Sequence, residues 1–200
     1  MRYFKCLQTG IDPKPFLSEI DAVDSIWYEQ TGRQKSASVQ REALAIPVRG
    51  MRKSAQGDRL RRDVHESRWT TGSFRMPAAR RFLQSVAEAE GGSLGRAKIV
   101  SLPPGNRVYP HIDRGDYYKV RNRYHLVLQS EGSWMRAGDE EVRMKTGELW
   151  WFDNKAEHEA MNDGAEPRIH IIFDLLPEKA TLVTPEDNAS MRYSLGNWGA

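Results

Sequence analysis

The second half of the chain constrains the fold most, because it is a series of short strand-like runs separated by turns. From Ala97 onward there are eight such runs of four to eight residues. Gly, Pro, Asn and Asp residues between the runs are typical of turns. Closely spaced strands with such turns predict a β-sandwich or a barrel. The runs are Ala97–Leu102, Arg107–Ile112, Arg123–Gln129, Ser133–Arg136, Glu141–Met144, Glu148–Phe152, His158–Asn162 and Arg168–Leu175.

The first half of the chain predicts helices and loops. Apolar residues recur at three- and four-residue spacing from Pro15 to Trp27, and again from Pro77 to Glu90. Gly91-Gly92 supplies a stop for the second helix. The stretch Gln30–Ser73 is polar and rich in arginine, which predicts loops and edge strands around one strand-like segment, Ala43–Val48.

A chain of 200 residues suits one domain with a single core. We expect residues 97–177 to form the β core. We expect residues 1–96 to pack on that core as a mixed helical and loop region that shapes substrate access. Residues 178–200 are expected to form a C-terminal tail without a recognisable motif.

Composition excludes several classes of protein. A hydrophobic fraction of 39% with 28% charged residues is typical of a globular protein and argues against disorder. Cys6 is the only cysteine, so no internal disulfide can form and nothing points to an oxidising compartment. The first ten residues lack a leader pattern, and nowhere do eighteen apolar residues run together. These features predict a cytoplasmic protein without a membrane span.

The charges are distributed unevenly along the chain, although the net charge is only +3. Arg33–Arg81 holds 13 basic and 4 acidic residues, whereas Glu131–Ala200 holds 7 basic and 14 acidic residues. Arginine-rich stretches are often solvated surface, and this one lacks the interleaved aromatic residues of RNA-binding modules. The composition therefore argues against nucleic acid as a partner, and we expect a small-molecule or peptide substrate, with the basic stretch favouring an anionic one.

Histidines and carboxylates gather in the strand-rich half. His111 and Asp113 are two residues apart, so on a strand or at its end both side chains can point to the same side. His158 on a later strand could complete two imidazoles and one carboxylate around a metal with one face open, the arrangement used by non-haem iron(II) oxygenases. A histidine alone is as readily a hydrogen-bonded core or surface residue, so the neighbouring residues decide.

Two further strands carry polar residues on one face. Alternation places Arg168 and His170 on the face opposite Ile169 and Phe173. A guanidinium inside a barrel is costly without an anion, and its planar fork suits a carboxylate. Arg123 and His125 repeat this pattern on an earlier strand, so both strands would line one pocket.

At these residues the chain resembles the aspartyl/asparaginyl beta-hydroxylase family of 2-oxoglutarate oxygenases, which includes free-proline hydroxylases. The resemblance covers about Lys98–Leu175 and is carried by several motifs. They are Pro104-Gly105, His111-Ile112-Asp113, Arg123-Tyr124-His125-Leu126, Gly147–Asn154, His158-Glu159-Ala160, Asn162 and Arg168-Ile169-His170.

The resemblance implies a mostly β fold with flanking helices around a double-stranded β-helix, the jelly-roll core of cupins. It implies that Fe(II) binds to His111, Asp113 and His158, and that Arg168 holds the distal carboxylate of 2-oxoglutarate. The cosubstrate site would be completed by Arg123, His125 and His170. Some relatives that act on epidermal-growth-factor-like domains lack the aspartate ligand, so its presence here argues against such a substrate.

The activity implied is hydroxylation of an amino acid or peptidyl side chain by O₂, coupled to decarboxylation of 2-oxoglutarate to succinate. Trp150, Trp151 and Phe152 are expected to pack in the core and to help keep the pocket dry. Glu157 and Glu159 flank His158 and are expected to face away from the metal.

Two other classes stay open. The same ligands could hold zinc or manganese in a cupin-like metalloenzyme, although such a hydrolase has no need of Arg168. The barrel could also be a non-catalytic ligand-binding module, although three retained ligands argue against it. The substrate and the oligomeric state cannot be read from the sequence.

Overall fold

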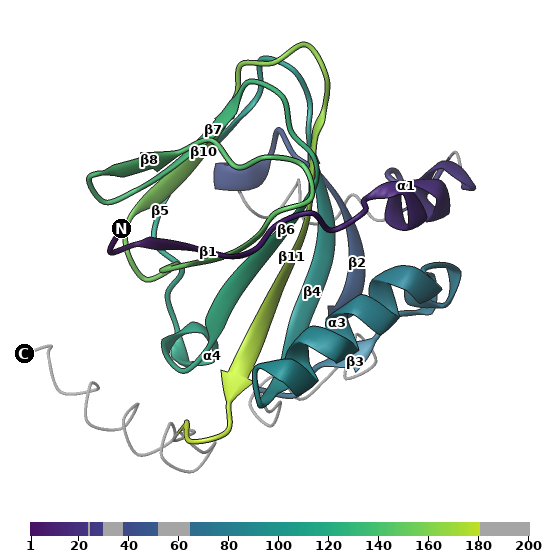
Figure 1. Ribbon diagram of the computed structural model, residues 1–200, viewed down its shortest axis with the longest axis vertical. Coiled ribbons are helices and arrows are strands. Elements are labelled where there is room, and N and C mark those ends of the chain that lie inside the picture. Colours follow the sequence, from purple (N-terminus) through teal and green to yellow (C-terminus); the bar gives the residue numbers. More distant parts are fainter. Residues whose placement is uncertain (24, 30–37, 52–64, 181–200) are drawn as a thin grey trace, which may run out of the picture.

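The computed structural model describes residues 1–23, 25–29, 38–51 and 65–180. Its strands form a seven-stranded and a four-stranded sheet that face each other (Figure 1). The larger sheet comprises β1 (Phe4–Gln8), β2 (Leu44–Gly50), β3 (Arg68–Trp69), β4 (Gly92–Leu102), β6 (Asn122–Gln129), β9 (Leu149–Phe152) and β11 (Arg168–Pro177). The smaller sheet comprises β5 (Arg107–His111), β7 (Ser133–Ala137), β8 (Glu140–Val142) and β10 (His158–Asn162).

Both sheets are antiparallel, and their strand order shows the crossovers of a jelly roll. The larger sheet runs β1-β9-β6-β11-β4-β2-β3 and the smaller sheet runs β5-β10-β7-β8. Successive strands from β4 to β11 therefore alternate largely between the two sheets. The prediction of a mostly β, double-stranded β-helix fold with flanking helices is confirmed.

All eight predicted strand-like runs form strands, with small differences in length. The largest difference is in β4, which begins at Gly92 rather than at Ala97. The reason is tertiary, because the additional residues pair with the end of β11, where Leu175 lies opposite Leu94 and Pro177 lies opposite Gly92.

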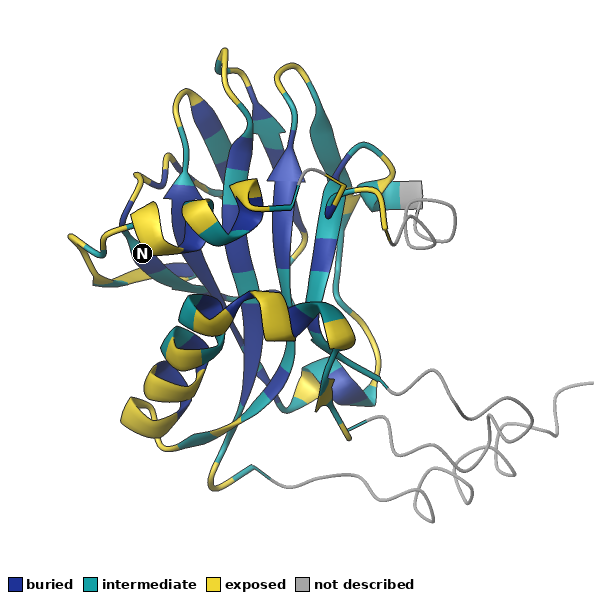
Figure 2. Cartoon of the chain, turned by 90° about the vertical axis from the view of Figure 1, so that its right-hand side faces the viewer, coloured by how far each residue is buried: buried dark blue, intermediate teal, exposed yellow. Residues whose placement is uncertain are grey.

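Two helices cover the outer face of the larger sheet. They are α1 (Lys14–Asp21) and α3 (Pro77–Ala89), and both lie on the side away from the smaller sheet (Figure 1). Their outward faces are exposed and their inward faces are buried (Figure 2). Leu83 of α3 packs with Ile171 and Phe173 of β11, all without exposed surface. Burying each such side chain stabilises the fold by about 1.5–3 kcal/mol.

The first helix is shorter than predicted, because it ends at Asp21 rather than near Trp27. The amide of Ala22 still donates to the carbonyl of Ser18, but the amide of Val23 donates to Ile20, which tightens the last turn. The apolar residues beyond it nevertheless reach the core: Ile26 is 3% exposed. Their spacing therefore reflects packing of a turn against the core and not a continued helix.

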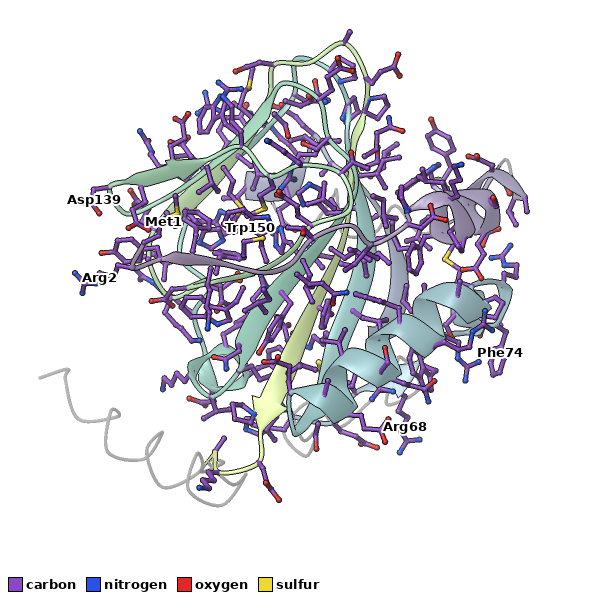
Figure 3. The ribbon with its side chains drawn as sticks, in the orientation of Figure 1. Met1, Arg2, Arg68, Phe74, Asp139 and Trp150 are labelled. Atoms are coloured by element: carbon purple, nitrogen blue, oxygen red, sulfur yellow. The ribbon has the colours of Figure 1, made fainter. Side chains whose placement is uncertain are left out.

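The first residues of the chain form an edge strand that the sequence did not reveal. Strand β1 pairs with β9 along one edge of the larger sheet. The Glu140 carboxylate accepts hydrogen bonds from the backbone amides of Arg2 and Tyr3 at 2.7 and 2.9 Å. Arg2 accordingly lies beside Asp139 in the turn between β7 and β8 (Figure 3).

Strand β2 confirms the strand-like segment predicted within Gln30–Ser73. It lies between β4 and the short β3, which forms the edge of the larger sheet. Segments 30–37 and 52–64 lie outside the described residues. The remaining short elements are η1 (Ser38–Gln40), η2 (Thr71–Arg75) and α4 (Asp116–Lys119).

The space between the sheets holds two small apolar clusters with a polar pocket between them. One cluster includes Phe4, Val127 and Phe152, and the other includes Val100 and Leu102. No helix in the described part of the chain has both the length and the apolar character needed to cross a membrane.

Candidate active site

Three side chains with potential metal-ligand atoms meet beside the pocket, and two of them, His111 and His158, line it. His111 ends β5 and His158 begins β10, and strand pairing places the two residues directly opposite each other. Asp113 follows two residues after β5. One potential ligand atom from each of the three residues lies within 4.8 Å of the others. In the described chain this is the one group of histidine, cysteine and acidic residues close enough to share a metal ion.

Each histidine is oriented by its own backbone. The Nδ1 atom of His111 lies 2.7 Å from the carbonyl of Tyr109, and that of His158 lies 2.9 Å from the carbonyl of Ala156. A carbonyl can only accept, so Nδ1 carries the proton in both rings. This leaves both Nε2 atoms as lone-pair donors, the orientation found in metal sites whose histidines are held by carbonyl groups.

The protonation states of His158 and Asp113 also favour binding of a metal cation. Burial and the neighbouring His111 lower the pKa of His158 to about 4, so its ring is neutral at neutral pH. Burial would raise the pKa of Asp113, but the Arg123 guanidinium and the Asn154 amide outweigh it and hold that pKa below its usual value. Neutral imidazoles and an ionised carboxylate are the forms that bind metals.

Arg123 lies beside this group and contacts two carboxylates. Its Nε and Nη2 atoms donate to Asp174 at 2.8 and 3.1 Å, and its Nη1 atom donates to Asp113. Burial acts to lower the pKa of Arg123, but the two carboxylates raise it well above its ordinary value. The residue that was expected to contact the cosubstrate therefore already forms two ion pairs within the protein.

Arg168 behaves differently. Arg168 is 3% exposed, and it lines the same pocket as His111 and His158. In the part of the chain that the structure describes, no hydrogen bond or ion pair reaches its guanidinium. Burial alone lowers the pKa of Arg168 to about 10, so the side chain is still charged at neutral pH.

His125 and His170 form a buried pair, with their Nδ1 atoms 3.3 Å apart. Burial lowers the pKa of both rings well below the usual value, so both are neutral. His125 lines the pocket, whereas His170 is not among the lining residues and its Nε2 atom has no partner among the described residues. His170 therefore lies behind His125, one layer from the pocket.

Several pocket residues were not singled out as site residues by the sequence. Lys98 and Gln40 form part of one wall, with the Nζ atom of Lys98 3.1 Å from Oε1 of Gln40. Glu159 also lines the pocket, but its carboxylate is bound by Arg107 and Arg136. The sequence around Glu159 does not indicate these two partners, because Arg107 lies on β5 and Arg136 lies on β7.

The three aromatic residues of β9 pack in different parts of the structure. Phe152 is 1% exposed and lines the pocket, with its ring centroid 5.1 Å from that of His158. Trp150 packs against the cluster between the sheets and lies beside the N-terminal strand in Figure 3. Trp151 packs against the helix-covered face. Core packing accounts for both tryptophans, and only Phe152 contributes to the pocket.

Comparison of the sequence with known protein families shows which family the chain belongs to. A sequence model of the aspartyl/asparaginyl beta-hydroxylase family matches residues 50–177, well over half of the chain. The chain belongs to this family. The matched part of this beta-hydroxylase family member includes His111, Asp113, His158, Arg123 and Arg168. Family and fold together indicate an oxygenase of the hydroxylase type.

Solved structures share the fold of this family member at low sequence identity. An oxidoreductase from Burkholderia pseudomallei, described as a member of the 2OG-Fe(II) oxygenase family, superposes with a TM-score of 0.51 at 8% identity, covering 88% of this chain and 95% of that chain. AviO1 from Streptomyces viridochromogenes Tue57 superposes with a TM-score of 0.51 at 11% identity, covering 91% of this chain and 93% of that one. These likenesses concern the two-sheet core and its helices.

Proposed function

We propose that the protein is an Fe(II)- and 2-oxoglutarate-dependent dioxygenase that hydroxylates an amino acid or a peptidyl side chain. His111, Asp113 and His158 would hold the iron, and Arg168 would bind the distal carboxylate of 2-oxoglutarate. Family membership supports this proposal, as does the description of one structural neighbour as a 2OG-Fe(II) oxygenase.

The observation that carries the proposal is the uncompensated charge of Arg168. A buried guanidinium without an anionic partner is strongly unfavourable, so it is retained only where a ligand supplies the anion. The pocket that Arg168 lines also contains the two histidines of the triad. A dicarboxylate could bind the metal through one end and pair with Arg168 through the other, because a planar carboxylate matches the guanidinium fork.

The donor set fits iron. Two neutral imidazoles and one carboxylate form the facial triad of non-haem iron(II) oxygenases and leave further coordination positions open. When bound, the iron would supply the redox chemistry that couples decarboxylation of 2-oxoglutarate to hydroxylation of a C–H bond. A zinc or manganese enzyme could use the same three ligands, but it would leave the buried charge of Arg168 without a function.

The protein would contribute binding, orientation and exclusion of water. Backbone carbonyls orient both histidines through Nδ1. Phe152 and Met135 provide apolar lining next to the triad. Apolar side chains beside the proposed metal ligands would help to exclude water from the reacting groups and so limit side reactions.

Substrate access would depend on residues 1–96. Gln40 and Ala43 from this region line the pocket beside Lys98. The basic stretch Arg33–Arg81, which was expected to favour an anionic substrate, lies partly outside the described residues. Arg59, Arg61 and Arg62 are among those outside.

The proposal is tested by binding and turnover of 2-oxoglutarate. The parent protein with Fe(II) should bind 2-oxoglutarate anaerobically and should release succinate in air, whereas the zinc-loaded protein should release none. Arg168→Lys keeps the charge but loses the fork, so 2-oxoglutarate binding should weaken by about 1.5–3 kcal/mol. Isothermal titration calorimetry measures the binding, and mass spectrometry measures succinate.

Arg143→Lys is the matched control, because Arg143 is exposed and its Nη1 atom donates to the carbonyl of Gly132. This variant should bind 2-oxoglutarate as the parent does. An unchanged affinity of Arg168→Lys for 2-oxoglutarate would refute the proposed role of Arg168 in binding the distal carboxylate. Hydrolytic turnover with zinc and no succinate with iron would favour the cupin-like metalloenzyme instead.

A further inference from the structure

We propose that Arg123 is a positioning residue of the metal site rather than a cosubstrate receptor. Locked in place by Asp174, Arg123 fixes one oxygen of Asp113 so that the carboxylate offers its other oxygen alone to the metal. This inference rests on the proposed function, because it concerns how the proposed aspartate ligand is held. It assigns a role to Asp174 and Asn154 as well, two residues outside the triad.

The two carboxylate oxygens of Asp113 have different surroundings. Its Oδ2 atom accepts hydrogen bonds from both Nη1 of Arg123 and Nδ2 of Asn154, the latter at 3.1 Å. The backbone amide of Asp113 also donates to the carbonyl of Asn154 at 3.1 Å, which fixes the main chain at the same point. With Oδ2 occupied by two donors, Oδ1 is the atom available to a metal, so binding would be through one oxygen.

The side chain of Asp174 holds Arg123 in place. Strand pairing places Arg123 of β6 opposite Asp174 of β11, and the two side chains form a two-point ion pair. The hydroxyl of Tyr117 from α4 donates to Oδ2 of Asp174 at 3.1 Å. The side chains of Arg123 and Asp174 are 9% and 3% exposed, so water competes little with these bonds. Arg123 is therefore held on the side away from the metal and presents Nη1 to Asp113.

The charges around Arg123 also argue against a cosubstrate role. Its guanidinium is paired with Asp113 and Asp174, and Lys155 adds a second positive charge that interacts with both carboxylates. The charge of Arg123 is therefore already compensated within the protein, so it attracts a further carboxylate less strongly than an unpaired guanidinium does. Arg168 has no carboxylate beside it among the described residues, and it is the better receptor for a dianionic cosubstrate. Carboxylate ligands are commonly held by hydrogen bonds of this kind, and removing them typically weakens metal binding about 10- to 100-fold.

The experiment separates metal affinity from cosubstrate affinity. Arg123→Lys keeps the positive charge but cannot bridge both carboxylates. Mn(II) binding is followed by electron paramagnetic resonance of the free ion, and 2-oxoglutarate binding is measured by calorimetry at saturating Mn(II). The ligand geometry is followed by the visible absorption spectrum of the Co(II)-loaded protein. We expect Mn(II) affinity to fall by about tenfold or more, an altered Co(II) spectrum, and a 2-oxoglutarate dissociation constant within about twofold of the parent's.

Arg168→Lys is the matched variant at the other arginine that lines the pocket. It should keep parental Mn(II) affinity and the parental Co(II) spectrum while losing 2-oxoglutarate affinity. Parental Mn(II) affinity and spectrum in Arg123→Lys, together with a tenfold loss of 2-oxoglutarate affinity, would overturn the inference and return Arg123 to the cosubstrate site.

Two further measurements keep the test decisive. If Arg123→Lys does not fold, as judged by thermal unfolding, Asn154→Ala removes the other donor to Oδ2 and should still alter the Co(II) spectrum. An unchanged spectrum in that variant would overturn the inference. The parent protein tests the proposed function separately, since a parent that binds neither Mn(II) nor 2-oxoglutarate would refute that function whatever the variants do.

Discussion

Replacing Arg168 with methionine should stabilise the protein while removing its cosubstrate site. Burial lowers the pKa of Arg168 from its ordinary value to about 10. One pKa unit corresponds to 1.36 kcal/mol, so holding this charge in the pocket costs on the order of 3 kcal/mol. Methionine has a similar length and no charge, so the variant should unfold with a free energy higher by about 1–3 kcal/mol once local relaxation is allowed.

The sign of the pH dependence follows from the same shift. The folded state holds the proton less tightly than the unfolded state, so the cost is fully present below pH 10 and declines as the pH rises further. The stability difference between Arg168→Met and the parent should therefore be constant from about pH 6 to pH 9. For a domain of this size the variant should melt about 2–10 °C higher in the absence of 2-oxoglutarate.

Adding 2-oxoglutarate should reverse the order of the two proteins. A ligand at one thousand times its dissociation constant stabilises the folded state by about 4.1 kcal/mol, which exceeds the advantage of about 1–3 kcal/mol expected for Arg168→Met. The Mn(II)-loaded parent should gain this amount in differential scanning calorimetry, and Arg168→Met should gain almost nothing. Arg143→Met at an exposed position should change neither value. A variant less stable than the parent without ligand would mean that Arg168 is compensated within the protein, and a parental response to 2-oxoglutarate would mean that another group binds it.

Three other predictions concern the triad and the scaffold. His158→Ala should abolish Mn(II) binding and succinate release while far-ultraviolet circular dichroism stays parental, and retained metal binding would contradict its role as a ligand. Gly164→Ala should lower the unfolding free energy by about 1–3 kcal/mol, because the new Cβ would clash with the carbonyl oxygen of Glu131; parental stability in urea would show that this turn moves freely. Leu83→Ala should cost about 2–5 kcal/mol in urea denaturation without changing Mn(II) affinity, and a changed affinity would link α3 to the metal site.

Local patterns in the sequence were sufficient to predict much of the fold. Alternation and turn residues were sufficient to predict all eight strands of the core, because side-chain direction along a strand depends only on neighbouring residues. The same alternation predicted that Arg168 and Arg123 would line one pocket. The spacing of His111 and Asp113, together with the family motifs, selected the residues whose potential ligand atoms lie within 4.8 Å of one another. Metal binding by these residues remains a proposal that the experiments above test.

Other features were settled only by tertiary structure. The sequence could not reveal β1, because an exposed edge strand of five residues carries little pattern until it pairs with β9. It could not assign Arg123 to Asp174 either, since the two residues are 51 positions apart and meet only through the register of β6 and β11. Local periodicity in the sequence thus predicted that Arg123, His125 and Arg168 face the pocket. It did not predict that His170 lies behind His125, or that Glu159, which was expected to face away from the metal, lines the pocket. Which partner each charge has was decided by strand pairing across the sheet, because electrostatic contacts depend on distances that only the folded chain defines.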